Sequence, residues 1–196
     1  MRRVAEIDLI LASTSRYRRE LLSRLVENFR QIAPAVDETP RPGESASVLA
    51  ARLAEAKARD VAARSPGAFI IGSDQVAECD GAILGKPGNF ENARVQLRNC
   101  SGRIAIFYTA LCVVGDDGKA RMAVDVTRVH FRDLSAIEID RYLEREQPFD
   151  CAGSFKAEAL GIALFERIES DDPTALIGLP MIALCRLFRE SGIEVL

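Results

Sequence analysis

The spacing of hydrophobic residues changes several times along the chain, which predicts alternating strands and helices. Short apolar runs at 9–12 and 68–71 are typical of buried strands. Apolar residues at helical spacing predict amphipathic helices over 16–25 and 47–64, the second with a stripe through Val48, Leu49, Leu53, Ala56 and Val61. By the same criteria we expect strands at 29–36, 103–114, 121–131 and 161–168, and helices at 91–100, 135–144 and 179–191.

Turn and capping residues sharpen this pattern in the second half of the chain. Gly115-Asp116-Asp117-Gly118 lies between two apolar runs and indicates a hairpin. Ser135 followed by Glu138 has the spacing of a capping box at a helix start. Because strands and helices alternate early and a hairpin comes later, we predict a mixed α/β sheet rather than a purely parallel one. No repeat or long linker divides the chain, so residues 1–196 are expected to form one domain.

Composition narrows the classes of function. The chain has 196 residues, 48% hydrophobic residues and a net charge of -3. A weakly acidic chain gives no support for binding a nucleic-acid polymer, which usually requires a basic face. The first apolar run is too short for a signal peptide, and the run at 175–185 is far below bilayer length, so a cytoplasmic protein is expected. Five cysteines without CxxC spacing suggest reduced thiols.

Familiar nucleotide and hydrolase motifs are missing. The sequence has no G-x-x-x-x-G-K-[ST], no G-x-G-x-x-G and no G-x-S-x-G. Gly85-Lys86-Pro87 is not a variant P-loop, because a proline favours an extended conformation at the residue before it. The single histidine, His130, lies in a strand of mixed polarity and is expected to be structural.

Polar residues at strand ends and in loops are the remaining candidates. Ser13 and Arg18 lie where a strand turns into a helix, a junction whose free N–H groups favour phosphate. The alternative is an ordinary N-cap with solvated arginines. Glu38 and Asp74 are carboxylates suited to a hard divalent cation or to orienting water, although turn-forming acids are the alternative. Lys86 is a natural phosphate partner.

By pattern alone, Lys57 reads as a surface lysine on its helix.

These residues fall within segments that together resemble the Maf family. The segments occur in the family's order: Leu11-Ala12-Ser13-Thr14-Ser15 with Arg18 and Glu20-Leu21-Leu22, Val36-Asp37-Glu38, Leu53-Ala54-Glu55-Ala56-Lys57-Ala58, Gly72-Ser73-Asp74-Gln75-Val76, Gly85-Lys86-Pro87, Tyr108-Thr109, Cys151-Ala152-Gly153-Ser154-Phe155 and Gly178-Leu179-Pro180. Each motif alone is weak, but their ordered occurrence over nearly the whole chain is specific.

The resemblance implies a fold, an activity and a set of roles. The implied fold is an elongated central mixed sheet flanked by helices, with two lobes around a cleft, as in Maf and inosine triphosphatase-like proteins. The implied activity is cleavage of a nucleoside triphosphate to its monophosphate and pyrophosphate, with Mg²⁺, Mn²⁺ or Co²⁺ as cofactor. Asp74 matches the catalytic base, and the other active-site positions are Ser13, Arg18, Glu38, Lys57 and Lys86. Glu38 and Asp74 would hold the metal.

Three further residues resemble the subgroup that acts on 7-methyl-GTP: Tyr17, Gln75 and Glu158. The ring of Tyr17 can stack on a methylated guanine, which is cationic. Arg16 stands where many members have proline, and Tyr17 where this subgroup has tryptophan, which are departures from the pattern. The alternatives are a dTTP or UTP pyrophosphatase of the same family, or a non-catalytic nucleotide-binding regulator of cell division. The family also suggests a homodimer.

Overall fold

The computed structural model describes residues 2–196, which divide into two compact units. Unit 1 combines the chain up to Gln75 with residues 109–125 and 172–196. Unit 2 combines residues 76–108 and 126–171. Three long strands contribute residues to both units: β4 (Phe69–Cys79), β6 (Ile104–Val114) and β7 (Ala120–Phe131).

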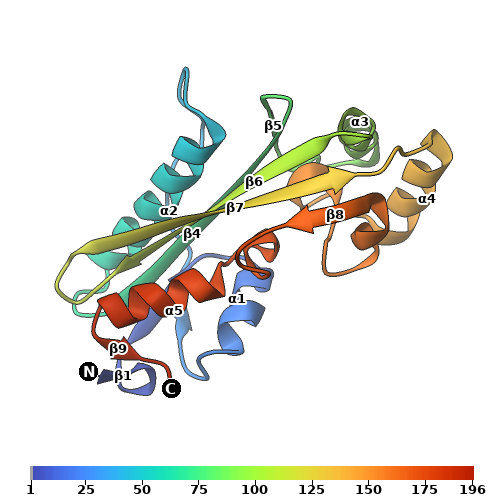
Figure 1. The fold of residues 1–196 in the computed structure, drawn as a ribbon. Coiled ribbons are helices and arrows are strands. Elements are labelled where there is room, and N and C mark those ends of the chain that lie inside the picture. Colours follow the sequence, from blue (N-terminus) through green and yellow to red (C-terminus); the bar gives the residue numbers. More distant parts are fainter. Residues whose placement is uncertain (1) are drawn as a thin grey trace. The chain divides into compact units, whose positions relative to one another are not determined.

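The strands form one mixed sheet in the order β3-β2-β4-β6-β7-β8, with β5 pairing to β4 (Figure 1). Strand β2 (Leu9–Ala12) runs parallel to both β3 (Arg30–Gln31) and β4. Strands β5 (Ala82–Leu84) and β8 (Phe165–Glu169) are antiparallel to β4 and β7. Parallel and antiparallel pairs therefore coexist, and the predicted mixed α/β class is confirmed. A separate parallel pair joins β1 (Arg2–Arg3) to β9 (Ile193–Glu194).

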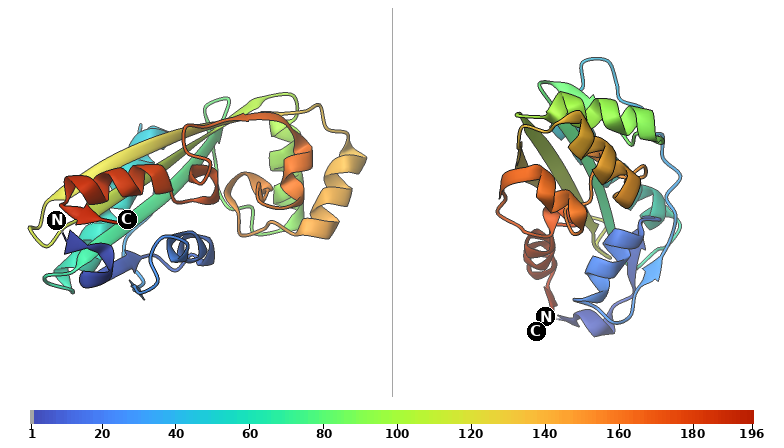
Figure 2. Two further views of the ribbon diagram at one scale, coloured as in Figure 1. Left: turned by 60° about the horizontal axis from the view of Figure 1, so that its bottom comes forward. Right: turned by 90° about the vertical axis from the view of Figure 1, so that its right-hand side faces the viewer.

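Unit 1 has three layers, because helices cover both faces of its central strands. Alternate residues of β2, β4 and β6, such as Leu11, Ile71 and Leu111, pack with the helices α1 (Arg16–Ser23) and α5 (Met181–Glu190). The helix α2 (Ala46–Ala63) covers the opposite face, so the strands lie between α2 and the α1–α5 pair (Figures 1 and 2). Both faces of these strands are fully buried, which explains their continuous apolar runs.

Glycine at position 72 sets how closely α2 approaches the sheet. A Cβ on Gly72 would lie 2.3 Å from the carbonyl oxygen of Ala54 and 2.8 Å from the Cβ of Ala58. Only a residue without a side chain allows this contact. Lys57 lies between these two alanines in sequence, so the close approach brings its helix against β4 beside Asp74.

Strand β4 differs from the sequence prediction. The apolar run predicted a short strand that ends at Ile71. Instead it continues to Cys79, and Asp74 lies inside a strand and is 7% exposed. The polar residues are accommodated because their side chains find partners on both faces of the sheet.

Unit 2 is built around aromatic residues and two packed helices. Phe107, Phe131, Phe155 and Phe165 form edge-to-face pairs with ring centroids 4.7 to 5.7 Å apart. Helix α3 (Phe90–Cys100) packs on α4 (Ala136–Glu146). The predicted capping box at Ser135 and Glu138 is present.

Four short 3-10 helices complete the described elements: η1 (Val4–Glu6), η2 (Ala152–Ser154), η3 (Leu160–Leu164) and η4 (Ala175–Ile177).

Several element predictions need correction. The expected strand at 29–36 shortens to β3, because residues 32–36 leave the sheet for a loop. The expected strand at 161–168 begins instead as η3 and becomes β8 only at Phe165. Strand β5 lies in a segment for which no strand was predicted. Val48 is 57% exposed and is not part of the buried stripe of α2.

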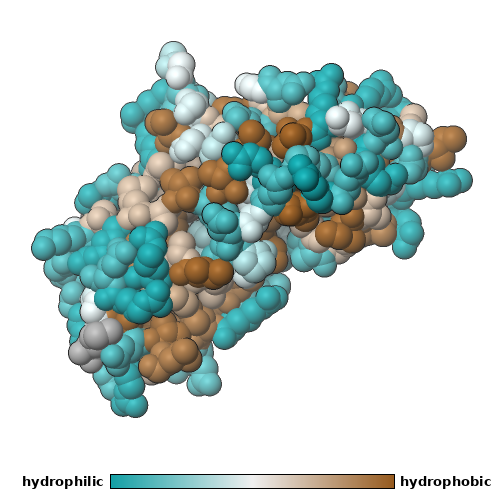
Figure 3. Space-filling model, in the orientation of Figure 1, coloured by the Kyte–Doolittle hydropathy of each residue, from teal (hydrophilic) through white to brown (hydrophobic). Residues whose placement is uncertain are grey.

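Hydrophilic and hydrophobic side chains are interspersed on the visible face of the molecule (Figure 3). The five cysteines are unpaired thiols, as the sequence suggested. Across residues 2–196, no helix is long and apolar enough to cross a membrane.

Candidate active site in unit 1

The candidate site begins where β2 ends and α1 starts. Ser13 follows the strand and is buried, and its Oγ accepts a 3.1 Å hydrogen bond from the backbone N–H of Ser15. Ser15 is the N-cap of α1, with its Oγ accepting from the N–H of Arg18. The N-cap alternative is therefore correct for Ser15. It leaves Ser13 as the serine that faces the rest of the site.

Arg18 is held by two contacts rather than solvated. Its Nε donates to the carbonyl oxygen of Gly178 at 2.8 Å, and its Nη1 to Ser13 Oγ at 3.4 Å. Gly178 has φ +122, a backbone conformation that favours glycine, so this residue type presents the carbonyl to Arg18. Burial lowers the pKa of Arg18, while the nearby Asp74 and Glu38 raise it. The alternative of a solvated arginine is therefore wrong at this position.

Lys57 joins the two candidate carboxylates. Its Nζ lies 2.6 Å from Asp74 Oδ1 and 2.6 Å from Glu38 Oε1. Lys57 and Asp74 have nearly buried side chains, whereas the side chain of Glu38 is 61% exposed. Lys57 is therefore not the surface lysine that its pattern suggested. Its role in an active site stays a prediction from the family resemblance. One cation bridges a buried carboxylate and an accessible one.

The loop that carries Glu38 is fixed by its own polar contacts. Asp37 Oδ1 accepts from the N–H of Thr39 at 2.9 Å, so Asp37 is the turn-forming acid of this pair. Arg52 on α2 donates to the carbonyl oxygen of Thr39 and forms a 2.6 Å ion pair with Glu44. These contacts tie the loop to the helix that carries Lys57.

The surroundings of Asp74 make its carboxyl harder to ionise. Burial raises the pKa of Asp74 above its ordinary value, and this is the largest effect. The positive charges of Lys57 and Arg18 oppose the increase, while Glu38 adds to it. A carboxylate with a raised pKa is a stronger base than an ordinary aspartate, which suits proton transfer from water.

Gln75 makes contacts within unit 1 through its amide. Its Nε2 lies 3.0 Å from Thr109 Oγ1 and from the carbonyl oxygen of Ala175, and 3.1 Å from that of Leu176. Thr109 Oγ1 donates to the Ala175 carbonyl as well. The amide nitrogen of Gln75 therefore holds the η4 segment, which leads directly to Gly178.

Ser73, for which the sequence pattern indicated no role, also lies among these contacts. Its Oγ donates to the carbonyl oxygen of Gly178 at 3.0 Å, the same oxygen that accepts from Arg18. The alternation of β4 explains this, since Ser73 and Gln75 point to one face of the sheet and Asp74 to the other. A serine directly before the aspartate inside an apolar strand is the sequence feature that could have identified it.

Tyr17 lies on the first turn of α1 and already contacts a cation. The guanidinium of Arg16 lies 4.7 Å from the centre of its ring, and Arg16 Nη2 donates to the Tyr17 hydroxyl at 2.7 Å. The residue that replaces the usual proline thus supplies a positive charge to an aromatic face. The ring is capable of the cation–π contact that we expected it to make with a methylated base.

Two predicted residues, Lys86 and Glu158, belong to unit 2. Lys86 is exposed just after β5, in a segment anchored by a hydrogen bond from the N–H of Gly88 to the carbonyl of Phe149. Glu158 is exposed before η3. Their roles stay predictions.

The structure brings together five of the predicted residues in unit 1, namely Ser13, Arg18, Glu38, Lys57 and Asp74.

Comparison with known proteins assigns the chain to a family. The model of the Maf family, described as Maf-like protein, matches residues 8–191. The chain belongs to the Maf family. It is 57% identical over 187 residues to the 7-methyl-GTP pyrophosphatase of Xanthomonas axonopodis pv. citri (strain 306), covering 95% of this chain and 98% of that protein.

A second relative is similar to the same extent, and a solved structure matches more weakly. The protein of Bordetella pertussis with the same name is 57% identical over 189 residues, which cover 96% of this chain and 94% of that protein. Among solved structures, the Staphylococcus aureus Ham1 protein matches with a TM-score of 0.47 and 18% identity, covering 64% of this chain and 72% of that chain.

Proposed function

We propose that this Maf protein hydrolyses 7-methyl-GTP to the nucleoside monophosphate and pyrophosphate. The observation that carries the proposal is the bridge from Lys57 to Asp74 and Glu38, next to the fixed guanidinium of Arg18. Such a group combines a base with positive charges suited to a phosphate chain. The proposed substrate is inferred from the names of similar proteins, which are 7-methyl-GTP pyrophosphatases.

The cations of the site would bind the triphosphate. Arg18 is positioned before substrate arrives, because Gly178 and Ser13 fix its guanidinium. Charge held in place in a partly dehydrated site stabilises a developing anion without reorganising. Lys57 would add a second positive charge. The hydroxyl of Ser13 is a further hydrogen-bond donor to a phosphate oxygen.

Asp74 is the proposed general base. Its Oδ1 accepts from Lys57, and no hydrogen bond to Oδ2 is present among the residues that the structure describes. Oδ2 would accept a proton from a water molecule as that water attacks the α-phosphorus in line with the departing pyrophosphate. Protonated Asp74 is tolerated because burial already disfavours its charge. The catalysis would therefore consist of positioning, charge stabilisation and one proton transfer.

The two carboxylates fit a magnesium-like cation. Mg²⁺ is usually bound through one or two carboxylates together with substrate phosphates and water. Asp74 and Glu38 flank the same Lys57 nitrogen, so their oxygens face one small region. In the described part of the chain, no group of three or more acidic, cysteine or histidine residues could hold a metal ion. The bound cation would neutralise phosphate charge and stabilise the leaving pyrophosphate.

Recognition of the base is proposed to involve Tyr17 and Gln75 of unit 1. Tyr17 would stack on the cationic methylated ring. The contacts of Gln75 favour an indirect role, in which its amide holds the segment that leads to Gly178. Gln75 is therefore proposed as a positioning residue.

A panel of nucleotides tests the proposal. Pyrophosphate release is measured with 7-methyl-GTP, GTP, dTTP and UTP in the presence of Mg²⁺, Mn²⁺ or Co²⁺. We expect the highest kcat/KM for 7-methyl-GTP and no release in the presence of a chelator. Preference for dTTP or UTP would replace the proposed substrate. Nucleotide binding without turnover would instead indicate a non-catalytic regulator.

A further inference from the structure

A second cluster of positive charges lines a hollow of about 210 Å³ in unit 2. Three arginines contribute to its wall: Arg132, which directly follows β7, and Arg141 and Arg145 on α4. The remaining lining residues are Glu138, Tyr142, Leu160, Ala163 and Leu164. None of them belongs to the motifs that resemble the Maf family, and none takes part in the proposed hydrolysis.

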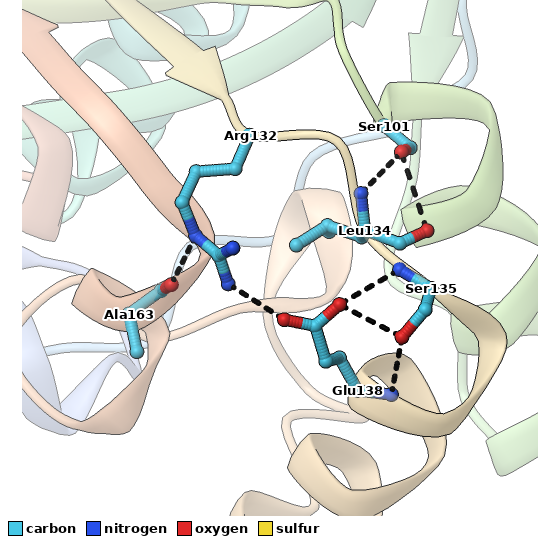
Figure 4. Close-up of polar contacts among 6 residues, drawn as sticks. All are labelled: Ser101, Arg132, Leu134, Ser135, Glu138 and Ala163. Carbon is cyan, nitrogen blue, oxygen red and sulfur yellow. Dashed lines mark hydrogen bonds and ion pairs between the residues drawn. The ribbon is translucent and has the colours of Figure 1, made fainter.

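Arg132 is held in place by its neighbours. Its Nε donates to the carbonyl oxygen of Ala163 at 2.9 Å, and its Nη2 to Glu138 Oε1 at 3.2 Å (Figure 4). Both contacts use one side of the guanidinium. An arginine fixed in this way loses little freedom when it binds an anion.

The charges around the hollow are not balanced. Glu138 is its only lining acid, and Glu138 Oε2 already accepts from the N–H and the hydroxyl of Ser135 (Figure 4). Hydrogen bonds from Ser135 are the largest cause that lowers the pKa of Glu138 to about 2, so this carboxylate stays charged. Within residues 2–196, neither Arg141 nor Arg145 forms an ion pair. They lie one helical turn apart, where like charges repel.

We propose that this hollow binds the phosphate group of a small organic phosphate. Three arginines and one carboxylate leave two positive charges, which match a phosphate monoester of about −1.5 to −2 charge at neutral pH. A carboxylate ligand would neutralise only one. Leu160, Leu164 and the ring of Tyr142 give an apolar surface for the attached group. The hollow is smaller than the roughly 300–1,000 Å³ of a pocket for a drug-sized ligand, so the attached group is small.

Nuclear magnetic resonance titration with ribose 5-phosphate, inorganic phosphate and acetate tests this site. The full chain is labelled, and the amide signals of residues 136–146 and the arginine Nε–H signals are followed. We expect saturable shifts around Arg132, Arg141 and Arg145 with both phosphates, and at least tenfold weaker binding of acetate. Ribose 5-phosphate should bind more tightly than inorganic phosphate, because the C–H groups of its ribose add contacts with Leu160 and the ring of Tyr142.

The Arg141→Gln/Arg145→Gln double variant supplies the decisive comparison. Both positions are exposed on α4, and the far-ultraviolet circular dichroism spectrum verifies that the variant is folded. It should bind ribose 5-phosphate at least tenfold more weakly, whereas Arg98→Gln, an exposed position on α3 of the same unit, should bind like the wild type. The proposal would be overturned if the double variant bound ribose 5-phosphate as tightly as the wild type. It would also be overturned by signal shifts confined to residues around Arg18. Either result leaves the proposed hydrolysis unaffected.

Discussion

The Nζ of Lys57, on helix α2, donates a 2.6 Å hydrogen bond to Oδ1 of Asp74, in the middle of strand β4. The two side chains meet because Gly72 lets the helix approach the strand two residues earlier. A buried ion pair of this kind contributes little stability by itself, because both charges lose water. The pair matters for chemistry instead, because it combines a fixed ammonium group with a buried carboxylate whose pKa is raised.

Replacing Lys57 with glutamine should move the acid limb of the pH–rate profile to higher pH. The positive charge of Lys57 lowers the pKa of Asp74, which burial otherwise raises. Without that charge the pKa rises further, so ionised Asp74 becomes available only at higher pH. We also expect kcat/KM to fall about ten- to a hundredfold, from loss of a charged contact to phosphate.

The measurement is kcat/KM for 7-methyl-GTP between pH 4 and 9, with Lys119→Gln in the β6–β7 turn as the matched control. The control should follow the wild-type profile. An acid limb in the Lys57 variant that stays in place, or moves to lower pH, would separate this limb from Asp74.

Replacing Gly72 with alanine should destabilise unit 1 and impair activity together. Its new Cβ would meet the backbone carbonyl of Ala54 at 2.3 Å, so α2 must move away from β4. Overpacking of this kind costs about 1–3 kcal/mol. Chemical denaturation measures the free energy of unfolding, with Gly85→Ala as control because its Cβ would meet nothing within 4 Å. Equal stability of the two variants would argue against the close contact.

Replacing Tyr17 with leucine should reduce discrimination in favour of the methylated nucleotide. A cation–π contact contributes about 0.5–2 kcal/mol, so kcat/KM for 7-methyl-GTP should fall about 2- to 30-fold. The value for GTP should change less, because its base is uncharged. Arg16→Ala removes the cation now on the ring and should retain the preference for 7-methyl-GTP. A parallel loss for both nucleotides in the Tyr17 variant would remove Tyr17 from base recognition.

Local sequence signals predicted much of the fold. The buried strand β2, the helix α1 and the capping box of α4 follow from apolar runs, helical spacing and a Ser–Glu pair, which act over a few residues. The same local signals ended the predicted strand at Ile71, because the residues that follow it are polar. Polar residues inside a buried strand are explained only by partners far away in the sequence.

The candidate site depended even more on distant contacts. Pattern reasoning placed Lys57 on the surface, since nothing in α2 reveals that Gly72 brings its helix against Asp74. It also left Ser73 without a role, because its partner Gly178 lies 105 positions away. The family resemblance, unlike the pattern of the helix alone, grouped Lys57 with Asp74. The structure places these two side chains in contact. The contacts of Ser73 and Gln75 became visible only in three dimensions.

The most direct test of the account compares wild type with Asp74→Asn in pyrophosphate release from 7-methyl-GTP and Mg²⁺. Asparagine preserves the shape of the side chain but cannot accept the proton of the attacking water, so kcat should fall at least about a hundredfold. Circular dichroism should show the same fold, and Asp171→Asn, an exposed position of unit 2, should retain activity. A folded Asp74→Asn protein that releases pyrophosphate at the wild-type rate would contradict the role of Asp74 as the base.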